Sequence, residues 1–137
     1  MSTLIPYLNF EGNCSEAMNF YKECLGGELM IQKVSQTPMA SQMPPEMQDF
    51  VMHARLEKGN IMIMASDAKD KDMTRGDMLS LMIQCDTEEE INTYFSKLSE
   101  GGTVNMPLAK QFWGATYGQI TDKFGVLWVF NYESSQG

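Results

Sequence analysis

The chain has 137 residues, of which 43% are hydrophobic and 20% are charged, a composition that is typical of a folded globular protein and excludes a disordered one. Its 18 acidic and 10 basic residues give a formal net charge of −8, which excludes nucleic acid as a partner because phosphates would be repelled. The apolar runs are too short to span a bilayer and the first residues lack a secretory signal, so we expect no membrane contact. Cys14, Cys24 and Cys85 form no CxxC pair, which favours free thiols and a cytoplasmic location.

Two stretches of the chain share one pattern. Leu4–Leu29 and Leu79–Val104 align without a gap at an offset of 75 residues. Each contains an apolar strand, a polar turn, an amphipathic helix, a Gly-Gly pair (Gly26-Gly27 and Gly101-Gly102) and the start of a new strand. This agreement predicts two copies of one supersecondary unit.

In the first copy, Asn13 or Ser15 is expected to cap a helix with its side-chain oxygen. Apolar residues then recur at helical spacing and predict one buried stripe: Ala17, Phe20, Tyr21, Cys24 and Leu25. Three strands are predicted to follow: Leu29–Val34, Phe50–Glu57 and Ile61–Ala65, with a tight turn at Lys58–Asn60. Ser35–Asp49, with three prolines, is too broken for regular structure, and a mobile lid is one interpretation of it.

In the second copy, Asp86 or Thr87 is expected to cap the helix, and Glu88–Glu90 suit its first turn because the helix dipole favours negative charge there. The predicted buried stripe is Ile91, Tyr94, Phe95 and Leu98. The predicted strands are Thr103–Met106, Thr116–Thr121 and Val126–Tyr132. Between the copies lies Ser66–Asp77, in which Asp67, Asp70 and Asp72 are spaced as in a calcium loop. The glycine and distal glutamate that would complete such a loop are missing, which favours a solvated linker.

These elements define the expected fold class. Strands and helices do not alternate regularly, so we predict an α+β protein with two tandem βαβββ modules and mostly antiparallel sheets around a cleft. We expect one domain over residues 1–137, with a first module over about 1–67, a linker over about 68–77 and a second module over about 78–137.

Two longer motifs carry a family resemblance. They are PYLNFEGNCSEAMNFYKECLGGEL near the start and FWGATYGQITDKFGVLWVFN near the end. With the repeated βαβββ pattern, they resemble the vicinal oxygen chelate superfamily of glyoxalase I, extradiol dioxygenases and bleomycin-resistance proteins. The PhnB-like branch, often labelled a 3-demethylubiquinone-9 3-methyltransferase domain, is the more similar one. The resemblance covers essentially the whole chain and implies a homodimer.

The resemblance also implies positions for a metal site. Metal-dependent members bind one divalent ion through four side chains, and these positions fall on Pro6, Met64, Ser80 and Val129. None of these residues is a suitable ligand for Zn, Ni, Fe or Mn, so we expect neither a metal nor another cofactor. The methyltransferase label also lacks support, since the Gly-rich turn and acidic residue of a Rossmann-like cofactor site are missing.

Strand alternation predicts which other residues line the cleft. If the four former ligand positions point inward, then Leu8, Met62, Met82, Leu127 and Asn131 share their faces. An apolar cleft with Ser80 and Asn131 as its few polar groups suits a small-molecule ligand, although a closed, packed core is the competing interpretation. Trp113 and Tyr117, which follow Phe112, either stack on a flat or cationic ligand or close the end of the barrel as core.

His53 is the only histidine of the chain and the one weak candidate for a catalytic residue. Histidine is the residue type most often used as a general base, but an ordinary strand histidine is the alternative. The candidate ligand-binding residues are therefore Leu8, His53, Met62, Met64, Ser80, Met82, Trp113, Tyr117, Val129 and Asn131. Asp122 is expected to cap its own turn, and Trp128 to pack under a helix.

Three functions remain open on this basis. The first is a metal-free protein that binds a small, partly apolar ligand. The second is a bleomycin-resistance-like protein that sequesters a cationic antibiotic in an acidic cleft. The third is an atypical metal-dependent lyase or dioxygenase that uses His53.

Overall fold

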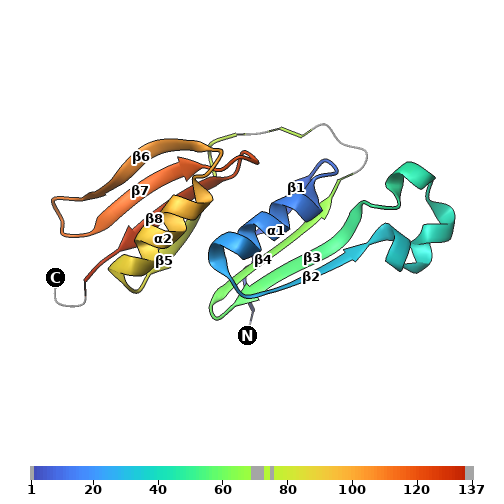
Figure 1. Cartoon of the computed structure of the whole chain (residues 1–137), viewed down its shortest axis with the longest axis horizontal. Helices are drawn as coiled ribbons and strands as arrows, with labels where there is room; N and C mark the ends of the chain where they lie inside the picture. Colours follow the sequence, from blue (N-terminus) through green and yellow to red (C-terminus); the bar gives the residue numbers. More distant parts are fainter. Residues whose placement is uncertain (1, 69–72, 75, 135–137) are drawn as a thin grey trace. The chain divides into compact units, whose positions relative to one another are not determined.

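The computed structural model describes residues 2–68, 73–74 and 76–134. The chain separates into two compact units, Met1–Thr74 and Arg75–Gly137, each with one sheet and one main helix (Figure 1). Half of the expected linker over 68–77, including Asp70 and Asp72, lies outside the described residues. Within the described part, no helix has the length and apolar character needed to span a membrane.

Unit 1 is a four-stranded sheet with one helix. Its elements are β1 (Tyr7–Phe10), α1 (Cys14–Leu25), β2 (Glu28–Lys33), β3 (Val51–Lys58) and β4 (Ile61–Asp67). The strand order is β1-β4-β3-β2, and β1 runs parallel to β4 whereas the other pairs are antiparallel. The first and last strands of the unit are therefore neighbours, and the helix is part of the long crossover between them.

Unit 2 repeats this arrangement. Its elements are β5 (Leu81–Cys85), α2 (Glu88–Leu98), β6 (Thr103–Lys110), β7 (Thr116–Thr121) and β8 (Leu127–Tyr132). The strand order is β5-β8-β7-β6, again with one parallel pair, β5 with β8. The predicted α+β class with two tandem βαβββ modules is confirmed, and each sheet is open rather than closed into a barrel.

The repeated Gly-Gly pair has the same two roles in both units. Gly26 and Gly101 have φ values of 81° and 75°, which allow the turn that follows each helix. Gly27 and Gly102 lie against the backbone of the neighbouring hairpin, where an added Cβ would collide with the carbonyl oxygens of Glu57 and Thr121, respectively. The Gly-Gly repeat in the sequence therefore marks the point in each unit where the chain leaving the helix passes close to the backbone of the sheet.

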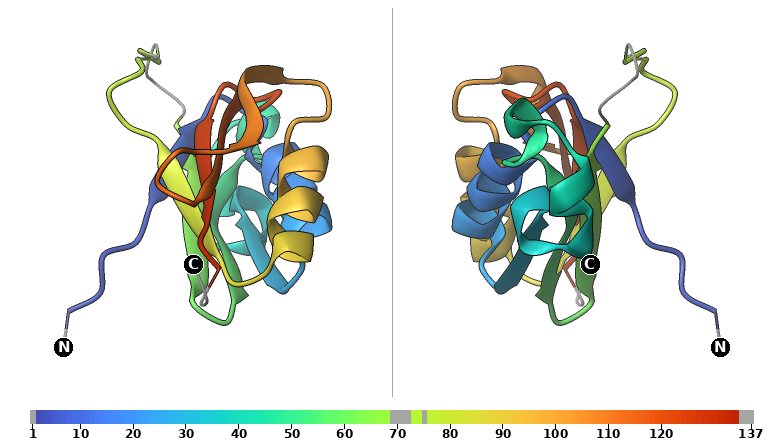
Figure 2. Two further views of the ribbon diagram at one scale, coloured as in Figure 1. Left: turned by 90° about the vertical axis from the view of Figure 1, so that its left-hand side faces the viewer. Right: turned by 90° about the vertical axis from the view of Figure 1, so that its right-hand side faces the viewer.

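Each helix covers one face of its own sheet (Figures 1 and 2). In unit 1, α1 packs on β2, β3 and β4, and the predicted stripe of α1 is buried as expected. In unit 2, α2 packs on β5, β7 and β8, and the Phe95 ring meets Phe130 edge-on at 5.3 Å between centroids. In unit 1, burial of a leucine such as Leu56 of β3, which is fully buried, stabilises the core by about 1.5–3 kcal/mol.

The two helices begin differently. The Thr87 hydroxyl accepts a hydrogen bond from the Glu90 amide at 3.0 Å, which confirms Thr87 as the cap of α2. The prediction that Asn13 or Ser15 caps α1 is wrong, since neither side chain accepts a bond from an amide of the first turn. Instead, Asp67 at the end of β4 accepts from the Cys14 amide at 3.0 Å. Asp67 is thus part of the fold, not of a solvated linker.

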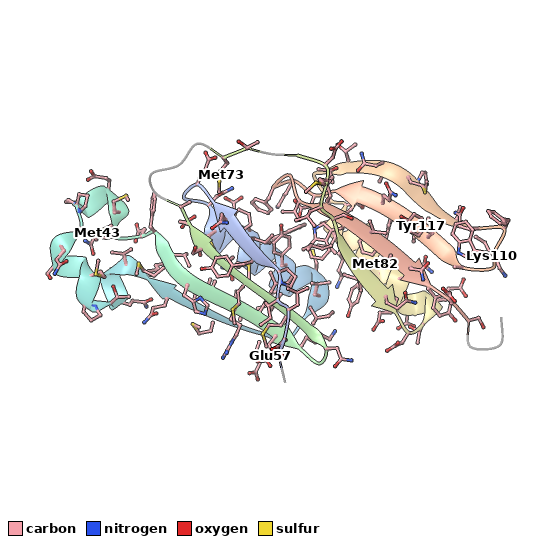
Figure 3. The ribbon with its side chains drawn as sticks, turned by 180° about the vertical axis from the view of Figure 1, so that it is seen from behind. Met43, Glu57, Met73, Met82, Lys110 and Tyr117 are labelled. Carbon is pink, nitrogen blue, oxygen red and sulfur yellow. The ribbon has the colours of Figure 1, made fainter. Side chains whose placement is uncertain are left out.

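The segment between β2 and β3 contains more regular structure than its prolines suggest. It forms three 3-10 helices: Val34–Gln36, Pro38–Gln42 and Pro45–Met47. The Gln48 amide donates to the carbonyl oxygens of Ala40 at 2.9 Å and Met43 at 3.0 Å, which ties these turns together. Met43 is labelled on this segment in Figure 3. The segment is a hydrogen-bonded excursion from the sheet, and its proposed role as a lid remains a prediction.

Candidate functional site

The faces of the two sheets that the helices leave uncovered carry most of the predicted site residues. We call them open face 1 and open face 2. Residues directly opposite each other on neighbouring strands point to the same side of a sheet, so the register assigns each side chain to a face. In unit 1, Ala54, Ala65 and Leu56 are fully buried on the helix side. The residues that alternate with them along the strands, such as Arg55 and Met64, point to the other side of the sheet, which is open face 1.

Open face 1 has one mixed row across all four strands. Tyr7 lies opposite Met64, Met64 opposite Arg55, and Arg55 opposite Met30. Met62 lies on the same face, one row further along, opposite Glu57. The face therefore combines thioether and aromatic groups with one guanidinium and a carboxylate.

His53 also lies on open face 1, in a polar row. It is half-buried, and Gln32 of β2 lies directly opposite it. Across the sheet the row ends with Ser66 of β4 and Asn9 of β1, which lie opposite each other. These are hydrogen-bonding neighbours rather than carboxylates. Their chemistry suits a ligand contact, and it supplies no acidic partner of the kind that commonly orients a catalytic histidine.

Open face 2 has an apolar row beside a polar one. The mostly apolar row comprises Met82, Val129, Gln119 and Met106, from β5, β8, β7 and β6. The polar row comprises Gln84, Asn131, Tyr117 and Ala109 in the same strand order. Figure 3, seen from the side away from α2, shows Met82 and Tyr117 on these strands.

Hydrogen bonds fix the polar groups of open face 2. The Asn131 amide donates to the Gln84 side-chain oxygen at 2.9 Å and to a Glu133 carboxylate oxygen at 3.4 Å. The Gln119 amide donates to the Tyr117 hydroxyl oxygen at 3.0 Å. Asn131 is buried, so this network is held in place before any ligand arrives.

Three aromatic rings lead from the β6–β7 hairpin onto open face 2. Phe112 and Trp113 meet edge-on, with centroids 4.9 Å apart and ring planes at 89°. Trp113 and Tyr117 lie 6.5 Å apart at 68°. Trp113 is 54% exposed and Phe112 97% exposed, so neither ring is packed as core in this unit.

The metal positions implied by the superfamily shift along the first strand of each unit, by one residue from Pro6 to Tyr7 in unit 1 and by two residues from Ser80 to Met82 in unit 2. The register places Tyr7 beside Met64 and Met82 beside Val129, whereas Pro6 and Ser80 come just before β1 and β5. A phenol, two thioethers and an alkyl group do not fit a divalent Zn, Ni, Fe or Mn ion. Among the described residues there is also no group of three or more His, Cys, Asp or Glu that could hold a metal.

The candidate residues thus fall into four places. Open face 1 carries His53, Met62 and Met64, and open face 2 carries Met82, Tyr117, Val129 and Asn131. Trp113 belongs to the hairpin, and Ser80 precedes β5, where it is exposed. Leu8 differs from the expectation, because it lies opposite Ala65 on the helix side of sheet 1. We leave it out of the proposed site.

Several residues of the open faces were not anticipated, among them Arg55, Gln84, Gln119 and Glu133. Period-two alternation continues from Met82 to Gln84 and from Tyr117 to Gln119, so this signal was present. Tyr7 lies one residue after Pro6, to which the resemblance assigns a ligand position, and is the first residue of β1. Glu133 follows β8, where no strand pattern points to it.

Two buried groups lie outside the open faces and are not part of the candidate site. One oxygen of the Asp122 carboxylate accepts from the amides of Phe124 at 2.8 Å and Val126 at 3.0 Å, and the other accepts from the Trp128 indole at 2.8 Å. This confirms Asp122 as the cap of its turn and places Trp128 on the helix side of sheet 2. Burial, and secondarily the Asp67 carboxylate, raises the pKa of the Cys14 thiol to about 12, so it is not a nucleophile near neutral pH.

The fold and these faces define a glyoxalase-fold protein. A glyoxalase/bleomycin resistance protein/dioxygenase family enzyme from Burkholderia phytofirmans has this fold, with a TM-score of 0.65 at 15% identity, over 93% of this chain and 97% of that one. At that identity the likeness concerns the fold alone. Protein YjdN of Escherichia coli (strain K12) is 32% identical over 142 residues, which cover 97% of each chain.

The family follows from the sequence match. The model of the 3-demethylubiquinone-9 3-methyltransferase family matches residues 2–130, and the chain belongs to this PhnB-like family. Protein PA1353 from Pseudomonas aeruginosa is 38% identical with a TM-score of 0.86, over 97% of this chain and 98% of that one. A putative 3-demethylubiquinone-9 3-methyltransferase, PhnB protein, from Bacillus cereus is 31% identical with a TM-score of 0.76, over 96% and 99%.

Proposed function

We propose that this PhnB-like protein binds a small, partly apolar ligand on open face 2, with open face 1 as a second candidate surface, and that it does so without a metal ion. One observation carries the proposal. The mostly apolar row, in which Gln119 accompanies Met82, Val129 and Met106, lies directly beside the polar row of Gln84, Asn131 and Tyr117. An apolar surface with a few fixed polar groups is the usual composition of a small-molecule site.

The chemistry of the donor set supports a metal-free site. Methionine thioethers suit soft ions such as Cu(I), and Val129 has no donor atom at all. The superfamily's use of a divalent ion to polarise an oxygen of the substrate therefore has no ligands at these positions. We propose no cofactor, and the methyltransferase label of the family is not part of the proposal because no cofactor motif accompanies it.

The test is a thermal-shift screen with a matched pair of variants. Uncharged aromatic and aliphatic compounds, quinones and thiol conjugates should include some that raise the melting temperature of the wild-type chain. Met82→Glu should abolish the shift, because Met82 lies on open face 2 and is 58% exposed, so that the variant still folds. Met78→Glu is the control, since Met78 is 94% exposed and precedes β5. Equal shifts in both variants would exclude open face 2.

A second candidate function is sequestration of a cationic antibiotic. The net charge of −8 and the exposed Trp113 ring favour it, since a cation is attracted both by an acidic protein and by an aromatic face. Some fold neighbours carry bleomycin resistance in their names. The same screen, extended to glycopeptide antibiotics, decides between the candidates: a sequestering protein binds the antibiotic and leaves it chemically unchanged.

Catalysis by His53 is a third candidate with less support. We propose His53→Ala as its test, with binding and turnover measured for a ligand that the screen identifies. A pure binding protein loses little affinity and shows no turnover before or after the substitution, whereas an enzyme loses turnover. Elemental analysis of protein purified without chelator gives an independent reading, because one divalent ion per chain would favour a metal-dependent enzyme.

The assembly and location are also proposals. We propose a homodimer, which the family resemblance implies, and light scattering at several protein concentrations is its test. We propose a cytoplasmic location, since the three cysteines are buried and form no CxxC pair.

A further inference from the structure

We infer that the β6–β7 hairpin recognises the ligand, and that the ligand carries a flat aromatic ring without negative charge and with an oxygen that accepts a hydrogen bond. This inference rests on the proposed function, since it names the ligand class of open face 2. It starts from Phe112 and Trp113, two large rings that are 97% and 54% exposed. Exposing such rings forgoes about 1.5–3 kcal/mol of burial each, which core packing leaves unexplained.

The hairpin holds these rings in a defined geometry. The Gln111 amide donates to the Ala115 carbonyl at 2.7 Å, and the Gly114 amide donates to the Gln111 carbonyl at 2.9 Å. Gly114 has a φ of 100°, a conformation that other residues rarely adopt, so the turn directly after Trp113 depends on glycine. The near-perpendicular Phe112 and Trp113 rings form a corner, in which a planar ligand can stack on one ring and meet the edge of the other.

The second tryptophan shows what a structural tryptophan looks like in the same unit. Trp128 is only 2% exposed, and its indole N–H donates to the Asp122 carboxylate at 2.8 Å. Trp113 is instead anchored through its contact with the Tyr117 ring at 6.5 Å. One tryptophan therefore serves the core, and the other presents its surface to the solvent beside open face 2.

Tyr117 supplies the polar contact. Its hydroxyl oxygen accepts from the Gln119 amide, which leaves its own proton to be donated elsewhere. On β6 the residue opposite Tyr117 is Ala109, whose small side chain leaves the flank of the phenol ring uncrowded. A ring stacked on Trp113 thus has a hydroxyl donor on the neighbouring ring, which calls for a carbonyl or ether oxygen on the ligand.

The charges nearby set the sign of the ligand. The Glu133 carboxylate belongs to the same polar network through Asn131, and the chain as a whole carries a net charge of −8. An anionic ring would be repelled by both. The ligand class is therefore an aromatic carbonyl compound, or a close relative of one, without negative charge.

The experiment compares three probes that share one ring system: 2-acetylnaphthalene, naphthalene and 2-naphthoate. Binding is measured by equilibrium dialysis and by quenching of tryptophan fluorescence. The ketone should bind most tightly, naphthalene about fivefold more weakly because it lacks the acceptor, and naphthoate more weakly still. Trp113→Leu should weaken ketone and naphthalene binding about tenfold and remove the quenching, since Trp128 is buried. Tyr117→Phe should weaken only the ketone.

Other outcomes overturn the inference. They are naphthoate binding as tightly as the ketone, no probe binding at millimolar concentration, or unchanged affinities in Trp113→Leu. A change of oligomeric state in Trp113→Leu with unchanged affinity would show that the rings form an interface between copies instead. The Met82→Glu comparison separates this failure from that of the proposed function. If a ligand is lost in Met82→Glu and retained in Trp113→Leu, open face 2 binds it without the hairpin.

Discussion

The two units share one topology and one strand order, yet they stabilise the start of their helix in different ways. In unit 2 the cap is local: Thr87 accepts from Glu90, and the Glu90 carboxylate accepts from the Asp86 amide at 2.9 Å. In unit 1 the cap comes from 53 residues further along the chain, because Asp67 of β4 bonds the Cys14 amide. The same fold thus depends on short-range sequence in one copy and on long-range contact in the other.

The long-range cap does more than end a helix. Asp67 also accepts from the Gly12 amide at 2.8 Å and, through its second oxygen, from the Val51 amide at 2.9 Å. It therefore joins the β1–α1 loop to the first residue of β3. Unit 2 has its own carboxylate with three donors, Asp122, but that one stabilises the β7–β8 turn instead. Duplicated modules keep their backbone path while the polar groups that hold it diverge.

The largest expected effect concerns the thiols, because each unit has one buried cysteine near its cap carboxylate. Burial is the main cause that raises the pKa of Cys14 and of Cys85 from 9.0 to about 12, and the next cause is Asp67 for Cys14 and Glu90 for Cys85. Only the thiolate reacts with a disulfide reagent, so both should be labelled about 1000-fold more slowly at pH 8 in the folded protein than in urea. Mass spectrometry of labelled peptides measures each rate.

Carboxylate substitutions make this test specific to each unit. Asp67→Asn should speed the labelling of Cys14 and leave Cys85 unchanged, and Glu90→Gln should do the reverse. Equal acceleration of both thiols by either variant would mean that the two units open together, which would contradict the separate behaviour expected here.

The next effect is that of the buried carboxylate of unit 2. Asp122→Asn replaces one acceptor oxygen by an amide N–H₂ that faces existing donors, since the two oxygens accept from Phe124, Val126 and Trp128. We expect a loss of about 3 kcal/mol in the free energy of unfolding, measured by urea titration with circular dichroism. The exposed Asp49→Asn should change it by less than about 0.5 kcal/mol. An equally small change in unfolding free energy for Asp122→Asn would show that Asp122 does not stabilise the fold.

The long-range cap of unit 1 should contribute somewhat less, because Asp67 is only half-buried. Asp67→Asn is expected to cost about 2 kcal/mol of unfolding free energy. Amide hydrogen exchange should show faster exchange at Gly12, Cys14 and Val51, the three residues whose amides bond Asp67. Exchange that is unchanged at these amides would show that water replaces the carboxylate without loss.

The smallest effect compares the two positions at which a cap was predicted. Thr87→Ala removes a hydroxyl that accepts from Glu90 and should cost about 1 kcal/mol. Asn13→Ala should cost less than about 0.5 kcal/mol, because its side chain accepts only a 3.3 Å bond from the Glu11 amide, outside the helix. Urea titrations of both variants decide the matter, and a larger cost at Asn13 would reverse the assignment of the caps.

Local signals predicted most of the fold. The helical stripes, the Gly-Gly pairs and the alternating strands each depend on residues close in sequence, and the repeat doubled every signal. The cap at Asp67 could not be predicted this way, because it depends on β1 lying beside β4 in a parallel pair with Phe10 opposite Asp67. No residue near position 67 in the sequence indicates that Phe10 lies opposite it.

The same limit affected the candidate site. Alternation along one strand places side chains on two sides, but only the register with the next strand says which side the helix covers. Alternation counted from Pro6 placed Leu8 on the wrong side of sheet 1. On β8, alternation alone was enough to place Val129 and Asn131 on one face, and the register with β5 agrees with it. The Trp113 and Tyr117 pair was predicted because the motif is local.

The edge position of β1 has a consequence for how the chain is made. In unit 1 the first strand to leave the ribosome has a single partner, β4, which is the last strand of that unit to be synthesised. Until then its amide and carbonyl groups have no ladder to join, and the same delay recurs for β5 and β8. In each unit, the first strand can therefore pair only after the last strand has been synthesised. Until then, the edges of β1 and β5 are exposed to neighbouring nascent chains.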